Sequence, residues 1–188
     1  GYTVELLQDF YRVTSPIEIQ DGQNVTFTTT NDVEGAGTLM RGTTGPLFHI
    51  GSGNTSTLNF NNIKLDGNGT GLGATNPLVY VESASAVVNL GNAASFGQDG
   101  PEIMNCKGVS DGAAISMAAG TLNVYDANIH DNTAQNAGAI NIAAGVKMTM
   151  QAGSIHDNVA SQDGGALVNA GTCSIYGGSF TNNIAQQG

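Results

Sequence analysis

The residues of this chain best suited to carry chemistry are two His-Asp pairs, His130-Asp131 and His156-Asp157. Imidazole nitrogens and carboxylate oxygens bind divalent metals, and together they can act as a general acid and base. The pairs lie 26 residues apart, and a third copy of the motif, 25 residues later, carries Thr181-Asn182 instead. Because repeats also duplicate surface residues, we expect the pairs to be surface residues. A metal site at them is the alternative, and no cofactor is expected.

A second set of candidates surrounds two tyrosines, Tyr125 and Tyr176, which occupy equivalent positions two repeats apart. Their strands also carry small polar residues, including Asn123 and Gln151. An exposed tyrosine among amides and hydroxyls suits a sugar or a protein ligand, because the ring joins apolar area to a polar tip. Tyrosine is also common in strands for ordinary structural reasons. We take these four residues as the candidate ligand-binding set.

Two further patterns have competing readings. The run Asp66-Gly67-Asn68-Gly69-Thr70-Gly71 resembles a calcium loop in its alternating oxygen ligands, but it lacks the later bidentate glutamate, which favours a plain glycine-rich loop. Four acids could border a groove in a carbohydrate-active enzyme: Asp66, Asp99, Glu102 and Asp111. Hydrolysis would need two of them to flank the scissile bond.

The elements that would position these residues repeat along the chain. Three columns of alternating apolar residues can be followed through it, with polar residues between them. The first column runs Ile17, Phe48, Val79, Ile115, Ile140, Leu167, the second runs Val25, Leu58, Val88, Leu122, Met148, Cys173, and the third runs Leu65, Phe96 or Ile103, Ile129, Ile155, Phe180. Alternation at period two predicts strands, and a fixed repeat of this length predicts a solenoid.

We therefore predict an all-β fold, a single-stranded, right-handed parallel β-helix of about six coils. The crossover rule favours right-handed connections, and coils of 25 residues or more are too long for the short left-handed hexapeptide type. Residues 1–16 are expected to cap the open end. Residues 17–188 are expected to form the β-helix, irregular to about residue 111 and built of regular coils of 25–27 residues from residue 112. Asn132, Asn158 and Asn183 are expected to stack as an amide ladder and to supply the left-handed conformation at a corner.

Composition excludes several function classes. The chain has 188 residues and a net charge of −10, with 5 Lys and Arg against 15 Asp and Glu, which disfavours nucleic acid and anionic lipid as partners. No stretch approaches the ~20 apolar residues of a membrane span, so we expect no membrane insertion. Cys106 and Cys173 lie more than two coils apart, too far for a disulfide, and are expected to be free thiols.

The later repeats resemble the polymorphic outer-membrane protein repeats of chlamydiae, in which Gly-Gly-Ala-aliphatic is followed by Phe-x-x-Asn. The last coil carries both motifs, Gly164-Gly165-Ala166-Leu167 and Phe180-Thr181-Asn182-Asn183. The two coils before it have Ile129 and Ile155 in place of the phenylalanine. The resemblance implies a right-handed β-helix in an exported, adhesin-like protein displayed on the bacterial cell surface. Because the chain stops inside a repeat at Gly188, we expect it to be a fragment of a larger protein.

Three functions follow as expectations. The first is a non-enzymatic, monomeric, extracellular module that binds a protein or glycan of a host or neighbouring cell. The second is a polysaccharide lyase or glycoside hydrolase on the same fold. The third is a passive stalk that only projects other domains.

Overall fold

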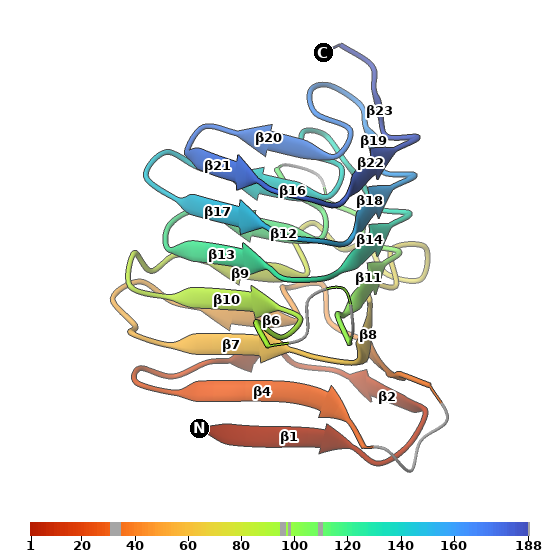
Figure 1. Cartoon of the computed structure of the whole chain (residues 1–188). Coiled ribbons are helices and arrows are strands. Elements are labelled where there is room, and N and C mark those ends of the chain that lie inside the picture. The colour runs from red at the N-terminus through yellow and green to blue at the C-terminus, as the bar shows by residue number, and fades with distance from the viewer. Residues whose placement is uncertain (31–34, 95–96, 98, 109–110, 188) are drawn as a thin grey trace.

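A computed structural model describes residues 1–30, 35–94, 97, 99–108 and 111–187. Across these ranges the chain forms strands, turns and bends and no helix, and therefore no helix that could span a membrane. The strands follow one another around a stack of coils that rises from the N-terminus to the C-terminus (Figure 1). Every strand pairing is parallel and joins one coil to the next, which confirms the predicted parallel β-helix.

Three long sheets make up its sides. Sheet A contains β1 (Tyr2–Leu6), β4 (Asn24–Thr29), β7 (Thr57–Phe60), β10 (Val87–Leu90), β13 (Thr121–Val124), β17 (Lys147–Met150) and β21 (Thr172–Ile175). Sheet B contains β2 (Phe10–Val13), β5 (Gly37–Arg41), β8 (Ile63–Asp66), β11 (Glu102–Met104), β14 (Asn128–His130), β18 (Ser154–His156) and β22 (Ser179–Thr181). Sheet C contains β3 (Ile17–Glu18), β6 (Phe48–Ile50), β9 (Val79–Val81), β12 (Ile115–Met117), β16 (Ile140–Ile142) and β20 (Leu167–Asn169).

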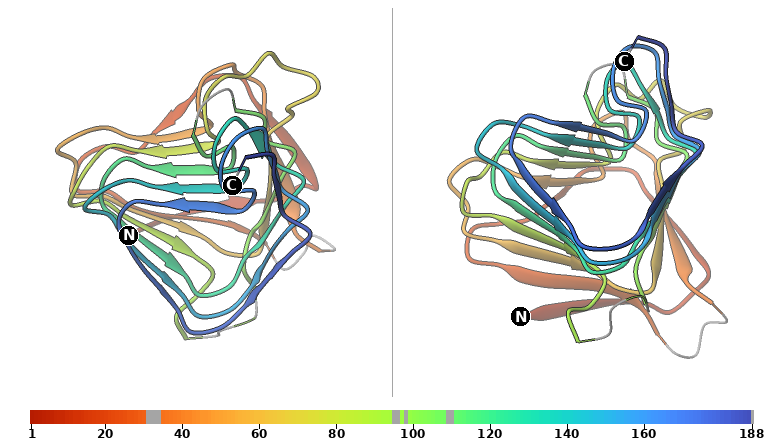
Figure 2. Two further views of the ribbon diagram at one scale, coloured as in Figure 1. Left: turned by 90° about the horizontal axis from the view of Figure 1, so that it is seen from above. Right: turned by 45° about the horizontal axis from the view of Figure 1, so that its top comes forward.

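A short fourth sheet, D, closes the later coils between sheets B and C. It contains β15 (Thr133–Ala134), β19 (Val159–Ala160) and β23 (Ile184–Ala185). Seen from above, the coils superimpose, and the yellow loop between β8 and β9 projects beyond their outline (Figure 2). The expected six coils are present, and Tyr2–Val13, at the N-terminal end of the stack, add a rung to sheets A and B.

The interior is built from the predicted columns. In sheet B the column runs in register through Tyr11, Leu39, Leu65, Ile103, Ile129, Ile155 and Phe180. Of the two residues considered for its fourth rung, Ile103 occupies it, and Phe96 lies outside the described residues. Parallel strands at ~4.8 Å spacing stack each side chain on its counterpart in the next coil. The columns of the three sheets therefore form one continuous apolar core.

The corner after sheet B corrects one expectation. The left-handed residues there are Asp131 and Asp157, with φ of 54° and 53°, and not the asparagines that follow them. Asn132 and Asn158 are instead completely buried, and their side chains point into the corner. Asn132 Nδ2 donates to Asn158 Oδ1 at 2.9 Å, and Asn158 Nδ2 donates to Asn183 Oδ1 at 2.9 Å. The predicted amide ladder is present, and Asp takes the strained conformation because it too tolerates positive φ.

Both cysteines are free thiols, as predicted. Cys106 is buried beside the corner, and burial raises the pKa of its thiol to about 12. Cys173 is partly buried and packs against the core on the last rung of sheet A.

Candidate functional site

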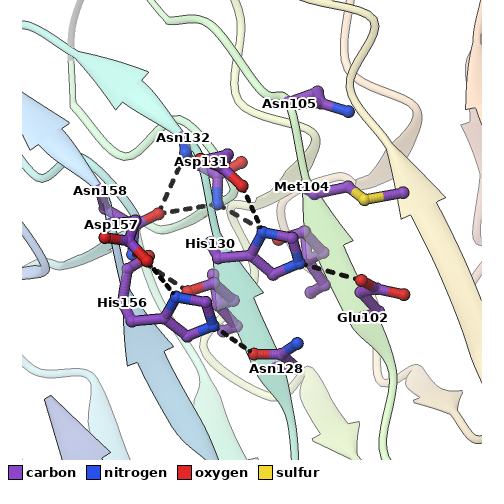
Figure 3. Close-up of polar contacts among 12 residues, drawn as sticks. Glu102, Met104, Asn105, Asn128, His130, Asp131, Asn132, His156, Asp157 and Asn158 are labelled. Atoms are coloured by element: carbon purple, nitrogen blue, oxygen red, sulfur yellow. Dashed lines mark hydrogen bonds and ion pairs between the residues drawn. The ribbon is translucent and has the colours of Figure 1, made fainter. Parts of the chain in front are cut away.

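The two His-Asp pairs lie on the outer face of sheet B, one coil apart. His130 and His156 are paired in register on β14 and β18, and their rings stack with centroids 5.0 Å apart and 6° between planes. Each Nδ1 contacts the aspartate that follows it, His130 to Asp131 and His156 to Asp157, both at 2.6 Å. Each Nε2 reaches back one coil, His130 to Glu102 at 3.0 Å and His156 to Asn128 at 2.9 Å (Figure 3).

Charge in this cluster is balanced across neighbouring coils. Burial alone would lower the pKa of His130, but its hydrogen bonds to Asp131 and Glu102 outweigh burial and raise it. Burial likewise opposes the shift at Glu102, whose pKa falls because His130 and Lys64 both bond to its carboxylate. The hydrogen bond from His156 lowers the pKa of Asp157. The carboxylates of Asp131 and Glu102, on either side of the His130 ring, thus favour its protonated form.

This geometry supports a structural role for the pairs better than a metal site. A ligating imidazole must present a nitrogen lone pair to the metal, and both nitrogens of each ring are already in hydrogen bonds to protein side chains. Within the described ranges, no group of three or more His, Cys, Asp and Glu is placed to hold an ion. The stacked pairs therefore act as a ladder that ties three coils together.

The four acids considered for catalysis do not meet in one groove. Glu102 borders a hollow of about 460 Å³ between sheets A and B, together with Asp126 and Asn128. Asp111 borders a different hollow, on sheet C, and its Oδ1 accepts from Asn136 at 2.9 Å. Asp66 lies one rung from Asn105 on sheet B, and Asp99 lies in the β10–β11 connection.

The calcium-like run proves to be a loop wrapped around a guanidinium. Arg41, at the end of β5, is completely buried beneath the loop between β8 and β9. Its Nε donates to Gly67 O at 2.9 Å and its Nη1 donates to Asn76 O at 2.8 Å, while Nη2 has no hydrogen-bond partner. One backbone carbonyl of the calcium-like run, Gly67 O, thus accepts from an internal cation. Burial lowers the pKa of Arg41, and nearby Asp66 opposes this.

The outer face of sheet A carries an asparagine ladder that the sequence analysis did not identify. Asn59 Nδ2 donates to Asn24 Oδ1 at 2.9 Å, Asn89 Nδ2 to Asn59 Oδ1 at 2.8 Å, and Asn123 Nδ2 to Asn89 Oδ1 at 2.9 Å. The signal was available, because three strands share an apolar-Asn-apolar pattern at the same column, Leu58-Asn59-Phe60, Val88-Asn89-Leu90 and Leu122-Asn123-Val124. Of the candidate set, Asn123 is therefore the end of a four-residue ladder.

A groove of about 360 Å³ runs along this ladder. Its lining consists of Asn24, Thr26, Asn59, Asn61, Asn89, Gly91, Asn92, Ala93 and Tyr125. Tyr125 follows β13 and is half-buried at one end of the groove. Gln151 and Tyr176 continue the same column, because Gln151 N donates to Val124 O and Tyr176 N to Met150 O. They lie one and two coils further on, and Tyr176 is 74% exposed. Three members of the candidate set, Tyr125, Gln151 and Tyr176, thus form one column, while Asn123 belongs to the neighbouring column of the ladder. Tyr125 is the member that borders the groove.

Comparison with known proteins adds no relative to this description: no family model, no curated protein and no solved structure matches the chain.

Proposed function

We propose that this protein is a non-enzymatic, adhesin-like binding module that uses the outer groove of sheet A to recognise a glycan or protein on a host or neighbouring cell. The observation that carries the proposal is the lining of the groove. Its nine described residues present amides, a hydroxyl, small side chains and one phenol, and none of them is charged.

The chemistry of this lining favours a neutral, hydrogen-bonding ligand. Binding sites gain specificity from a few well-placed polar groups, and the ladder amides are held in place by one another. The Oδ1 atoms of Asn24, Asn59 and Asn89 each accept from the next asparagine. Asn59 also donates from Nδ2 to Val25 O at 3.1 Å. The second N–H of Asn89 and the remaining lone pairs of the three Oδ1 atoms are therefore left for a ligand. Sugar hydroxyls both donate and accept, so they match a row of amides better than a charged group would.

The repeats support a location for this protein at the cell surface. Gly164-Gly165-Ala166-Leu167 and Phe180-Thr181-Asn182-Asn183 resemble repeats of bacterial surface proteins, and the acidic, weakly charged surface is consistent with an extracellular module. We place the protein at the bacterial cell surface, as a monomer whose partner is a host protein or glycan.

Binding to a glycan array and to epithelial cells tests the proposal, with wild type compared with Asn89→Asp, Tyr125→Ala and Tyr176→Ala. Asn89→Asp places a carboxylate beside the Asn59 carbonyl and should abolish binding, while Tyr125→Ala should weaken it about tenfold. Thr181→Ala, on exposed β22 of sheet B, is the control and should leave binding unchanged. If only Tyr176→Ala lost binding, the binding site would lie at Tyr176, two coils beyond Tyr125, and not in the groove. No binding by the wild type would favour the passive stalk.

A further inference from the structure

The outer face of sheet C holds a second hollow, on a different side of the β-helix from the asparagine groove. It has a volume of about 330 Å³ and lies over β9, β12 and β16. Its lining is Asn76, Pro77, Tyr80, Asp111, Ser116, Ala118, Asn141 and Ala143. The outward column beneath it runs Glu18, His49, Tyr80, Ser116 and Asn141, one residue per coil.

Tyr80 is fixed in this column with one face covered. Its ring stacks on the imidazole of His49 at 5.7 Å, with 11° between the planes. The phenol donates to Glu82 Oε1 at 3.2 Å. His49 is itself held from both sides, with Nδ1 2.7 Å from Glu18 and Nε2 2.9 Å from Glu82. A surface tyrosine would normally exchange rotamers, so this bracing supplies a preorganised aromatic platform.

The other face of the ring looks along the stack toward Ser116, because Tyr80 and Ser116 are paired in register. Serine is too small to cover an aromatic ring, so the hollow begins where the next stacked side chain would have been. Ser116 is only 6% exposed and forms the floor. Asn141, one rung further, and Asp111 supply polar groups around it.

Asp111 is brought to the hollow by the turn that follows it. Gly112 has φ of 74°, and a Cβ there would lie 2.4 Å from Ile115 O and 3.0 Å from Asn141 Cβ. Only glycine allows this close approach of the turn to β16. Asn136 Nδ2 then holds Asp111 by its Oδ1 at 2.9 Å. The Asp111 carboxylate is thus held in place at the hollow, as the Tyr80 ring is.

We propose that this hollow binds one pyranose unit of an uncharged glycan, with Tyr80 as its stacking platform. The face of a pyranose presents polarised C–H groups, which the electron-rich face of the ring attracts, while its rim presents hydroxyls. Three side chains can bond those hydroxyls. The hydroxyl of Ser116 and the amide of Asn141 can each donate and accept, and the carboxylate of Asp111 accepts. The carboxylates of Asp111 and Glu82 disfavour uronates and other acidic sugars. This site is separate from the sheet A groove and does not depend on it.

Solution NMR of the whole chain tests the proposal. The probes are lactose, cellobiose, mannobiose and chitobiose, with digalacturonate as the acidic comparison and choline as a cationic one. At least one neutral disaccharide should shift the Tyr80 ring and Asn141 amide signals. Tyr80→Ala should weaken that binding at least about tenfold, and Tyr80→Phe should keep it within about threefold because only the bond to Glu82 is lost.

Tyr125→Ala serves as the control and should leave these shifts unchanged, since Tyr125 borders the other groove. The proposal is overturned if no neutral disaccharide shifts these signals, if Tyr80→Ala binds as well as wild type, or if choline binds in place of every sugar. Because Tyr80 lies outside the core, we expect each variant to remain folded. Amide spectra of each variant check this.

Discussion

The later coils and the earlier coils differ in how side chains bond the buried backbone groups at the corner after sheet B. In the later coils the backbone groups of the corner are bonded by Asn132, Asn158 and Asn183, each of which also bonds its own copy one rung away. The ladder begins where Asn132 Oδ1 accepts from Cys106 N. In the earlier coils a long side chain, Arg41, reaches the carbonyls of Gly67 and Asn76, and Asn68 Nδ2 donates to Arg41 O at 3.1 Å.

The difference reflects coil length. A short side chain can bond its copy in the next coil only when the coils are of equal length and the copies stack in register. Where loops of unequal length intervene, as between β8 and β9, no copy lies in place, and a side chain long enough to cross the gap does the work instead. Arg41 does so incompletely, because Nη2 stays unbonded. In the regular coils, small neutral side chains thus bond the buried polar groups of the corner, whereas the irregular corner also uses a buried charge.

Asn158→Ala is the most severe test of this comparison. It removes the bonds from Nδ2 to Ile129 O and Asn183 Oδ1 and leaves the backbone N–H of Asn132 without its acceptor. Asn132 and Asn158 are completely buried, and Asn183 is partly buried. Unsatisfied buried groups cost ~1–3 kcal/mol each, so we expect a loss of about 3 to 5 kcal/mol in the free energy of unfolding. Urea denaturation measures it, with hydrogen exchange at Asn132 to localise it. Asn123→Ala, in the exposed ladder, is the matched control. If Asn158→Ala lowered the free energy of unfolding by less than about 1 kcal/mol, its hydrogen bonds would not be what stabilises the corner.

Arg41→Met should cost less, about 2 kcal/mol. The substitution orphans two carbonyls, Gly67 O and Asn76 O, but it also removes a buried charge whose solvation is incomplete. The same denaturation experiment applies, with Arg12→Met, an exposed arginine on β2, as control. Limited proteolysis between β8 and β9 should increase in Arg41→Met alone. Unchanged stability and proteolysis would show that the loop does not need the guanidinium.

The pH dependence of stability compares one histidine from each region. Burial alone would lower the pKa of His49, but hydrogen bonds to Glu82 and Glu18 outweigh it and raise the pKa, just as Asp131 and Glu102 raise the pKa of His130. A raised pKa means that protonation favours the folded state. This stabilisation is complete below the pKa of free imidazole, ~6.5, and is lost as pH rises through the folded value.

We therefore expect the free energy of unfolding to fall over the pH range above ~6.5, with each histidine contributing part of the fall. His49→Gln and His130→Gln should each remove part of the fall, and the double variant should flatten the profile. Stability that rises over this range, or a fall that neither substitution reduces, would show that the two clusters do not stabilise the protonated rings.

The columns could be predicted from sequence because they depend only on period and apolar type. Ile129, Ile155 and Phe180 mark one rung each however the loops between them vary. The bonding of the corners could not be predicted in the same way. Asn132 was placed in the left-handed conformation because asparagine permits it, yet the adjoining Asp131 adopts it so that the amide can turn inward. Position within a turn follows from three-dimensional fit, which residue type alone does not determine.

The candidate site likewise has features that could be predicted from the sequence and features that could not. Tyr125, Gln151 and Tyr176 were predicted to share one column and do so, because they follow strands of constant spacing. The groove could not be anticipated, since Asn92 and Ala93 reach it from the irregular connection after β10. Asn59, Asn89 and Asn123 needed only an alignment of the outward positions, which the apolar columns already provided. Asn24 could not be found in this way, because it joins the ladder diagonally and Thr26 occupies the position opposite Asn59.

The smallest expected change in stability is that of Asn89→Ala, which separates the two asparagine ladders. Asn89 makes two ladder bonds, to Asn59 and from Asn123, as Asn158 does with its neighbours, but water can replace them because the face is open. We expect a loss of about 0.5 kcal/mol in the free energy of unfolding, several-fold less than for Asn158→Ala. If the two losses were equal, burial would not distinguish the ladders. If Asn89→Ala were silent in stability yet reduced glycan binding, the outer ladder would serve recognition, whereas the inner one serves the fold.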